Sequence, residues 1–276
     1  MTSTNMNCQL IPAPEILRQY IRYYSIIDFR DCQAAEKSVK CFADRYPRLV
    51  VREPGQSTVT RREDNIQLPG SYLSGIDTKA TEYQVRGEYA HIGASFYPQA
   101  LKVFFNIDCC ELVDQTVDLS LFIPAGTLEK ICEVQTPQEK IAQLNQFFVN
   151  RLNQTKFEDK VINDIIHRDA ESGNFRVGKY LNRYEISERS LERKFSESIG
   201  VSPKTYLRII RFEQALELVL CKYYPHLSEV AHYLQYTDQS HFIKEFKQFS
   251  GYQPVLFQRQ ERLGNESAAF LMRETD

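Results

Sequence analysis

Several kinds of protein are excluded by what this sequence lacks. It has no tryptophan and no apolar run near the roughly 18 residues that a membrane span requires. The N-terminal stretch MTSTNMNCQLIPAPEI lacks the basic segment and apolar core of a secretory signal. Charge of neither sign dominates, since 34 Lys+Arg stand against 36 Asp+Glu. We therefore expect a cytoplasmic protein without a membrane partner, and bulk charge alone does not indicate nucleic acid.

Cysteine is present in an arrangement that argues against disulfides and metal. The seven cysteines are scattered, their number is odd and no CxxC occurs, so reduced thiols in a reducing compartment are expected. The adjacent pair Cys109-Cys110 could be redox-active, although small buried side chains are the simpler interpretation. A cupin metal centre needs two or three histidines on neighbouring strands, and the β-rich region offers only His91. We expect no cofactor, no metal and no catalytic residues.

Length and local pattern divide the chain into two parts. A chain of 276 residues suggests two domains, and 42% apolar with 25% charged residues is ordinary for globular proteins. Residues 9–24 show a helical pattern after a turn at Pro12 and Pro14. From about 45 to 97, short alternating runs predict strands; they are 48–51, 66–68, 72–76, 82–86 and 89–97. A helix is expected after Pro98.

The boundary between the two parts is expected near 153–158. Before it, Thr136-Pro137-Gln138-Glu139 matches a capping box, which predicts a helix over 137–152. Ile141, Leu144, Phe148 and Leu152 form a stripe on this helix. The stripe could be core, a prop between domains or a dimer seam. Beyond the boundary, residues 157 to about 260 have a helical pattern throughout.

The helical part contains an internal repeat. VGKYLNRYEISERSLERKFSESIGVSP (177–203) is echoed by LSEVAHYLQYTDQSHFIKEFKQFSGYQP (227–254). Four residues of the first copy recur 51 positions later: Leu191, Phe195, Gly200 and Pro203 correspond to Phe242, Phe246, Gly251 and Pro254. Each copy is predicted to be a short helix, a tight turn and a longer helix. Ser187 and Asp238 stand where each longer helix would be capped.

This geometry is that of a helix-turn-helix, which places the start of its second helix in a DNA major groove. The apolar i, i+4 pairs Leu191/Phe195 and Phe242/Phe246 would anchor each second helix and leave the opposite face free. The side chains on those faces suit base edges; the predicted base-reading residues are Arg189, Glu192, Arg193, Gln239, Ser240, Ile243 and Lys244. Predicted phosphate contacts are Ser187, Ser190, Lys204, Arg208 and Lys247. For either helix alone, a solvated polar face is the better explanation of the pattern. The duplication favours a role in reading DNA bases.

A long helix is expected between the copies. Ser202-Pro203 is a cap followed by proline at the first helical position, and the helix then runs to about 221. About 19 residues would span roughly 28 Å, which is close to the turn of B-DNA, about 34 Å. The linker helix could therefore present two second helices to successive major grooves.

Residues 157–262 resemble the AraC/XylS family of bacterial transcription regulators. The resemblance is carried by ISERSLERKFSESIGVSPKTYLRIIRFEQALEL and DQSHFIKEFKQFSGYQP. It implies a domain of two helix-turn-helix units, about 176–198 and about 227–250, joined by the linker helix. It also implies binding to double-stranded promoter DNA in the bacterial cytoplasm (nucleoid-associated), contact with RNA polymerase and, as the commoner habit in the family, activation. The base-reading residues given above are the positions carried over.

Three positions depart from the family pattern. The family often has glycine where this chain has Glu185 and Gln235, and left-handed backbone costs other residues about 1 kcal/mol. Leu181 stands where a small residue is usual, whereas Ala231 keeps it in the second copy. We expect either strained turns or slightly different turn geometry.

The N-terminal part resembles, more weakly, the sensory domain of one branch of these regulators, through LPGSYLSGIDTKATEYQVRGEYAHIGASFYPQALKVFFN. Such domains are cupin-like and bind a small-molecule effector, form homodimers, or both. The expected fold class is therefore α+β: a β-rich, cupin-like domain with flanking helices (1–156), an all-α DNA-binding domain (157–262) and a tail (263–276).

Two alternatives remain at this point. An architectural DNA-binding protein would need a basic surplus for sequence-independent binding, yet residues 157–262 hold 16 Lys+Arg and 15 Asp+Glu. An enzyme fused to a DNA-binding module, such as a cysteine-based repair enzyme, would need clustered cysteines holding zinc, and the cysteines here are dispersed.

Overall fold

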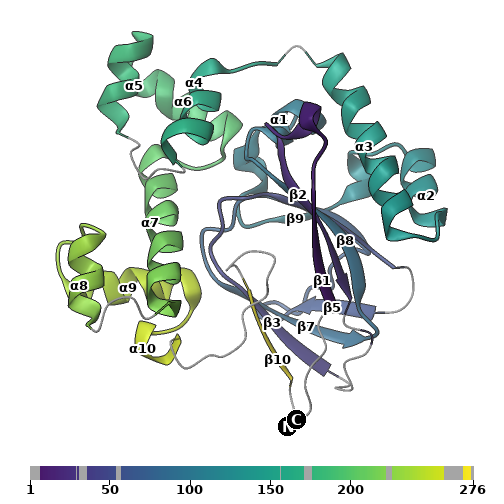
Figure 1. Ribbon diagram of the computed structural model, residues 1–276, viewed down its shortest axis with the longest axis horizontal. Helices are drawn as coiled ribbons and strands as arrows, with labels where there is room; N and C mark the ends of the chain where they lie inside the picture. Colours follow the sequence, from purple (N-terminus) through teal and green to yellow (C-terminus); the bar gives the residue numbers. More distant parts are fainter. Residues whose placement is uncertain are drawn as a thin grey trace.

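Two antiparallel sheets form the N-terminal half of the molecule (Figure 1). The computed structural model describes residues 7–28, 30, 36–53, 57–155, 157–170, 176–221, 226–257 and 270–274. The larger sheet contains, in spatial order, β1 (Asn7–Pro12), β2 (Ile21–Asp28), β8 (Ala90–Phe96), β4 (Arg48–Arg52), β6 (Ser71–Ser74) and β9 (Thr116–Asp118). The smaller contains β10 (Phe270–Glu274), β3 (Glu36–Cys41), β7 (Thr81–Gly87) and β5 (Ser57–Arg61).

The larger sheet is covered on both faces. One face packs Leu49, Val51 and Phe96 against the helices in a large apolar cluster. The other face carries Ile27, which packs with Val59 and Val85 of the smaller sheet. Every residue of β8 is therefore buried, as expected for a central strand with cover on both sides.

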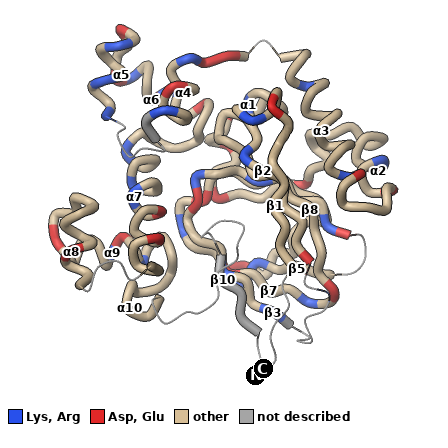
Figure 2. The backbone as a smooth tube through the Cα atoms, viewed as in Figure 1, with Lys and Arg blue, Asp and Glu red and all other residues tan. Residues whose placement is uncertain are grey.

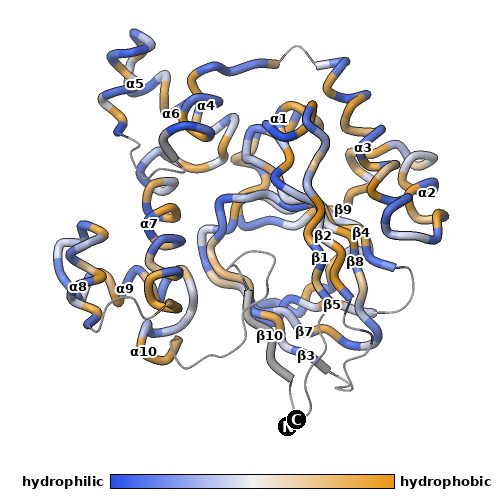
Figure 3. The backbone as a smooth tube through the Cα atoms, viewed as in Figure 1, coloured by the Kyte–Doolittle hydropathy of each residue, from blue (hydrophilic) through white to orange (hydrophobic). Residues whose placement is uncertain are grey.

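Helices flank the larger sheet along one side (Figure 1). They are α1 (Ala100–Phe105), α2 (Ala125–Glu133) and α3 (Pro137–Gln154), with short 3-10 turns η1 (Glu15–Leu17), η2 (Cys109–Leu112) and η3 (Leu119–Leu121). The stripe on α3 is core, because Ile141, Leu144 and Phe148 are buried against the sheet and α1. Its apolar side can be followed in Figure 3.

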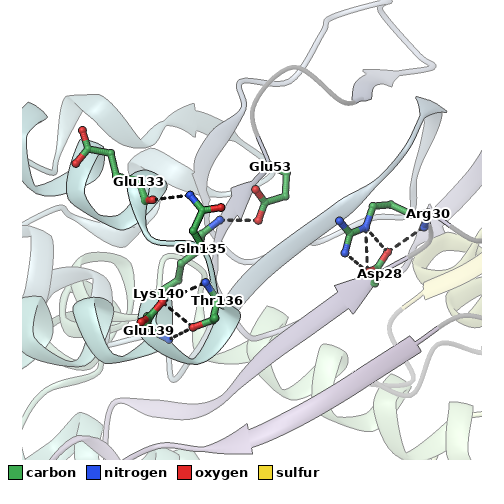
Figure 4. A network of polar contacts seen from close by, with 8 residues as sticks. All are labelled: Asp28, Arg30, Glu53, Glu133, Gln135, Thr136, Glu139 and Lys140. Carbon is green, nitrogen blue, oxygen red and sulfur yellow. Dashed lines mark hydrogen bonds and ion pairs between the residues drawn. The ribbon is translucent and has the colours of Figure 1, made fainter.

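The predicted capping box at the start of α3 is confirmed. The Thr136 side chain accepts from the Glu139 N–H, and Glu139 Oε2 accepts from the Thr136 N–H at 3.2 Å. One turn further on, the buried Lys140 donates to Glu53 Oε1 at 2.5 Å, which ties α3 to the end of β4 (Figure 4).

Two predictions for the N-terminal half are wrong. Residues 9–24 form no continuous helix; they contain β1, η1 and the start of β2. Ile21 and Tyr24 are buried because β2 lies between β1 and β8 and packs on α3, where Tyr24 donates to Asn145 Oδ1 at 2.7 Å. A strand buried on both faces can mimic helical spacing. Residues 66–68 are also no strand, since only an isolated bridge joins Gln67 to Thr60.

The C-terminal half is helical, as predicted. Its elements are α4 (Lys160–Asp164), the π-helical turn η4 (Ile165–Ala170), α5 (Val177–Tyr184), α6 (Glu188–Ser198), α7 (Pro203–Leu220), α8 (Leu227–Tyr233), α9 (Gln239–Ser250) and α10 (Pro254–Phe257). Figure 1 shows the pairs α5–α6 and α8–α9 at opposite ends of α7. This arrangement confirms the α+β fold class.

The two halves are joined by a shared apolar core as well as by the connecting chain. The apolar core of the helical half includes Phe42, Ala43 and Ile76 from the β-rich half. Gly200, with φ 103°, ends α6 so close to η2 that a Cβ would lie 2.8 Å from the Cys109 carbonyl oxygen. Strand β10, beyond α10, pairs with β3. The expected tail at 263–276 thus includes a strand, and residues 263–269, 275 and 276 lie outside the described part.

Candidate nucleic-acid interface

The first helix-turn-helix unit is α5–α6. Ser187 caps α6, its Oγ accepting from the Ser190 N–H at 3.2 Å. Between the helices, Glu185 adopts φ 51° and ψ 41°, which is the left-handed conformation that glycine reaches most cheaply. The Ile186 N–H donates to the Leu181 carbonyl oxygen at 3.2 Å and closes the turn. The chain therefore makes the family turn with a strained non-glycine residue.

The second unit, α8–α9, repeats this design. Asp238 caps α9 by accepting from the His241 N–H at 2.7 Å. Gln235 has φ 57° in the turn, and the Tyr236 N–H donates to the Ala231 carbonyl oxygen at 2.9 Å. The equivalent residues of the two turns, Glu185 and Gln235, are thus both left-handed. The repeat found in the sequence is a repeat of backbone geometry.

An apolar seam fastens each second helix. Leu191 and Phe195 of α6 are buried, and so are Phe242, Phe246 and Phe249 of α9. The ring centroid of Phe212, on α7, lies 5.4 Å from that of Phe246 and 5.3 Å from that of Phe249. These edge-to-face and tilted contacts add to the burial of apolar area. The seam fixes which face of each helix is left outward.

The outward faces carry the predicted base-reading residues. On α6, Arg189, Glu192 and Arg193 are exposed. Arg193 is 71% exposed, and its Nε lies 4.0 Å from Glu197 Oε1, so this surface ion pair restrains it little. On α9, Gln239, Ser240 and Lys244 are exposed, whereas Ile243 is half-buried against the core. Their roles in reading bases stay predictions.

The predicted phosphate contacts fall into two groups. Ser187, Lys204 and Lys247 are exposed, and Ser190 is half-buried. Arg208 is engaged within the molecule, because its Nε lies 2.6 Å from Glu245 Oε2 and its Nη2 donates to Gln248 Oε1 at 3.1 Å. A phosphate contact by Arg208 stays a prediction and would have to coexist with these bonds.

Glu245 is the buried centre of an ion-pair cluster between α7 and α9. Its side chain is only 2% exposed, and Arg211 Nη2 also reaches it, at 3.2 Å from Oε1. The Arg211 Cζ lies 4.2 Å from the ring centroid of Tyr236. Burial, followed by the nearby Glu245 charge, raises the pKa of Tyr236. The cluster orients the second unit on the linker helix.

A groove of about 1040 Å³ runs along α7 between the two units. Of the predicted site residues, it brings together Glu192, Lys204 and Arg208. Three groove residues that the sequence analysis did not select are Arg176, Tyr233 and His241. The helical period places His241 away from the outward face of α9, so a helical projection does not reveal it.

Charge around the interface is mixed. Basic residues mark α5, α6 and α7, and acidic residues are interleaved with them (Figure 2). Such a surface gives little sequence-independent attraction to DNA compared with a basic stripe.

A second cavity, of about 100 Å³, lies between the two sheets. Valine and leucine side chains make up much of its wall, among them Val50, Val59, Leu68 and Val85. Polar groups reach it from Arg48, Asp77 and His91, as well as from Tyr72 and Tyr83. Burial raises the pKa of Asp77 to about 7, against the opposing charge of Arg48. A mainly apolar hollow with a few convergent polar groups is the usual form of a small-molecule site.

Within the described ranges, no group of three or more His, Cys, Asp or Glu side chains is arranged to hold a metal ion. His91 lies in the wall of the cavity, with its ring centroid 5.2 Å from that of Tyr89. In the same described part of the chain, every helix is too short or too polar to cross a membrane.

Comparison with known families decides the class of the helical half. A helix-turn-helix domain family matches residues 180–260, which contain most of α5, all of α6 to α10 and both left-handed turns. The helical half is therefore a helix-turn-helix domain of the AraC type. This AraC-type domain makes the protein a DNA-binding transcription regulator. Residues 9–118 match a second family, described as a domain of unknown function (DUF6597).

The comparison with solved structures finds ToxT from Vibrio cholerae. A 1.65 Å structure of ToxT is 12% identical, with 85% of this AraC-type chain and 97% of ToxT covered at a TM-score of 0.42. Wild-type ToxT bound to an unsaturated fatty acid is 12% identical, with 94% and 97% covered at a TM-score of 0.41. A comparison with curated proteins finds no match.

Proposed function

We propose that this regulator reads promoter DNA by inserting α6 and α9 into successive major grooves. The observation that carries the proposal is a repeated unit at the two ends of one rigid helix. In each copy a left-handed turn, a side-chain cap and a buried seam leave a polar helix face outward. The linker helix α7 has 18 residues and so spans about 27 Å, near the turn of B-DNA, about 34 Å.

Within this proposal, the outward side chains make different contacts with the DNA. Arg189, Arg193 and Lys244 donate to guanine, and Gln239 pairs with adenine. Glu192 accepts from cytosine, Ser240 contacts a base edge and the half-buried Ile243 touches a thymine methyl through its exposed part. Ser187, Ser190, Lys204, Arg208 and Lys247 contact phosphates and set the register.

The proposed setting is the bacterial cytoplasm, with the protein associated with the nucleoid and acting as an activator that contacts RNA polymerase. The proposal assigns no catalytic step to the chain. A homodimer, if formed, uses a surface other than the α3 stripe, because Ile141, Leu144 and Phe148 are already buried within one chain.

We further propose that the β-rich half senses a small molecule in the cavity between the sheets. Its volume, about 100 Å³, is below the roughly 300 Å³ of common drug-sized sites and near that of cavities which hold benzene. The walls suit a compact apolar body. Arg48 and His91 suit one polar or anionic end. The ligand is therefore a small organic molecule with a single polar group.

The alternative of an architectural protein without effector control predicts equal affinity for all DNA. To separate the two, purified full-length protein is used to select fragments from genomic DNA. A selected fragment and a random fragment of the same length are then titrated at several salt concentrations. The regulator proposal predicts that the selected fragment binds at least about 10³-fold more tightly at physiological salt. Equal affinity at every salt concentration would contradict it.

A further inference from the structure

The stretch between β3 and β4, residues 42–47, connects the cavity to the DNA-binding domain; we name it the β3–β4 segment. On one side it continues from β3, whose Val39 and Cys41 line the cavity. On the other side it leads into β4, whose Arg48 and Val50 line the same cavity. Any change in the separation of the cavity walls therefore acts on both ends of a six-residue segment.

The middle of the β3–β4 segment is docked on the second helix-turn-helix unit. Phe42 is fully buried in the helical core, with its ring centroid 5.6 Å from that of Phe257 on α10. The Ala43 N–H donates to the carbonyl oxygen of Phe249 at 2.9 Å. Phe249 belongs to the seam that holds α9. The segment thus touches the structure that positions this reading helix.

The same segment holds the linker helix by an ion pair. Arg45, itself buried, places its Nε 2.9 Å from Glu213 Oε2 on α7. Burial raises the pKa of the Glu213 carboxyl, and the Arg45 charge opposes that rise. The Arg45 Cζ also lies 4.7 Å from the ring centroid of Tyr46. Because α7 carries both helix-turn-helix units, the ion pair that anchors α7 to the β3–β4 segment affects the position of both units.

A third connection runs through the β6–β7 turn. Asp44 and Asp77 exchange backbone hydrogen bonds, at 2.9 Å and 3.0 Å. Asp77 lines the cavity, and Arg48, which also lines it, forms an ion pair with Asp44. A polar group bound beside Arg48 would compete with the Asp44 carboxylate. A molecule in the cavity would therefore act on the β3–β4 segment in two ways, by displacing the cavity walls and by competing for Arg48.

We propose that the β3–β4 segment couples occupancy of the cavity to the DNA-binding domain. Bulk placed between the sheets moves Cys41, Arg48 and Asp77, loosens the docking of Ala43 on Phe249, and frees α7 and α9 to change position. This inference rests on the proposed sensing function, whose site it deepens by naming the element that carries the signal.

The coupling can be tested without DNA and without the natural ligand. In the full-length chain, Val59→Phe adds bulk to the cavity from β5, which lies outside the segment. Hydrogen exchange at the Ala43 amide is then compared with wild type. We expect exchange to rise roughly fivefold or more, the lower range of typical allosteric coupling. The control is Val149→Phe on α3, outside the cavity wall, and it should leave the Ala43 amide unchanged. Should Val59→Phe not fold, Val85→Leu replaces it.

A double-mutant cycle tests the route. Glu213→Gln removes the charge of the ion pair and keeps the side-chain shape, so it should itself raise exchange at Ala43. Combined with Val59→Phe, the two effects should be less than multiplicative, because both act on the same docking. An unchanged Ala43 amide in Val59→Phe, an equal rise in the control, or fully multiplicative effects would each overturn the proposal. Since no DNA is present, failure here differs from failure to bind promoter DNA.

Discussion

Glu245 shows that one buried residue can determine how two helices pack, although the sequence around it does not reveal this role. It is buried on α9 and is held by Arg208 and Arg211, which come from α7. The apolar seam of α9 indicated which side of the helix faces outward: Gln239, Ser240 and Lys244 are exposed there, whereas Ile243 is half-buried. The sequence could not predict that Arg208 is ion-paired, because the partner lies 37 positions away and the pairing depends on how α7 crosses α9.

Arg193 is the residue whose loss should affect sequence recognition most selectively. It is 71% exposed on the outward face of α6, so Arg193→Ala should leave thermal stability almost unchanged. Binding to the selected fragment should weaken by about 1–3 kcal/mol, with relaxed preference at one base position. Titration against fragments altered at each position measures this. The control is Arg62→Ala, an exposed arginine paired with Glu82 in the β-rich half. An equal loss on all sequences would show that Arg193 contacts phosphate.

Asp77 should make the stability of the protein depend on pH near neutrality. Its pKa is raised to about 7 by burial, whereas an unfolded aspartate titrates near about 3.9. Between these values the folded chain holds a proton that the unfolded chain has lost, so stability falls as pH rises from about 4 to about 7. Urea unfolding at about pH 5 and about pH 8 should show this loss, and Asp77→Asn should reduce it. An identical pH dependence in Asp77→Asn would refute the assignment.

At the scale of elements, local chemistry predicted most helix boundaries. The caps Thr136, Ser187, Ser202 and Asp238 all accept a backbone N–H at the expected helix start. Strand β2 was missed for a physical reason. Its buried positions face both the neighbouring sheet layers and α3, and the resulting spacing in sequence resembles one face of a helix.

The turns of the two helix-turn-helix units are conformationally strained in both copies. Gln235 has φ 57°, where a side chain costs about 1 kcal/mol or more relative to glycine. Gln235→Gly should therefore stabilise the protein, by up to about 1 kcal/mol after the greater freedom of unfolded glycine is subtracted. Denaturant unfolding measures the change. Gln235→Ala keeps a Cβ and should give no gain, so equal stabilisation by both substitutions would refute the strain account.

At the scale of the whole molecule, the sequence predicted two parts and placed their boundary between α3 and α4. It gave no sign that the halves share a core, because Phe42 and Ala43 enter the helical core from a loop more than a hundred residues earlier in the chain. Nor did it indicate that β10 returns to pair with β3. Long-range docking depends on surfaces that form only after each half has folded, and sequence periodicity does not encode them.

The shared core also helps to position the two reading helices, α6 and α9. The AraC-type domain meets the β-rich half at both ends: α6 against η2 through Gly200, and α9 against the β3–β4 segment through Phe249. The spacing of α6 and α9 therefore depends on α7 and on the β-rich half together.

The central claim is that two helices of one chain read two successive major grooves. Hydroxyl-radical footprinting of the full-length protein on a selected fragment tests it most directly. We predict two protected patches on one face of the duplex, about 10 base pairs apart. Arg193→Ala should weaken one patch, and Lys244→Ala the other. A single patch of one half-site, or uniform protection along the fragment, would contradict the account.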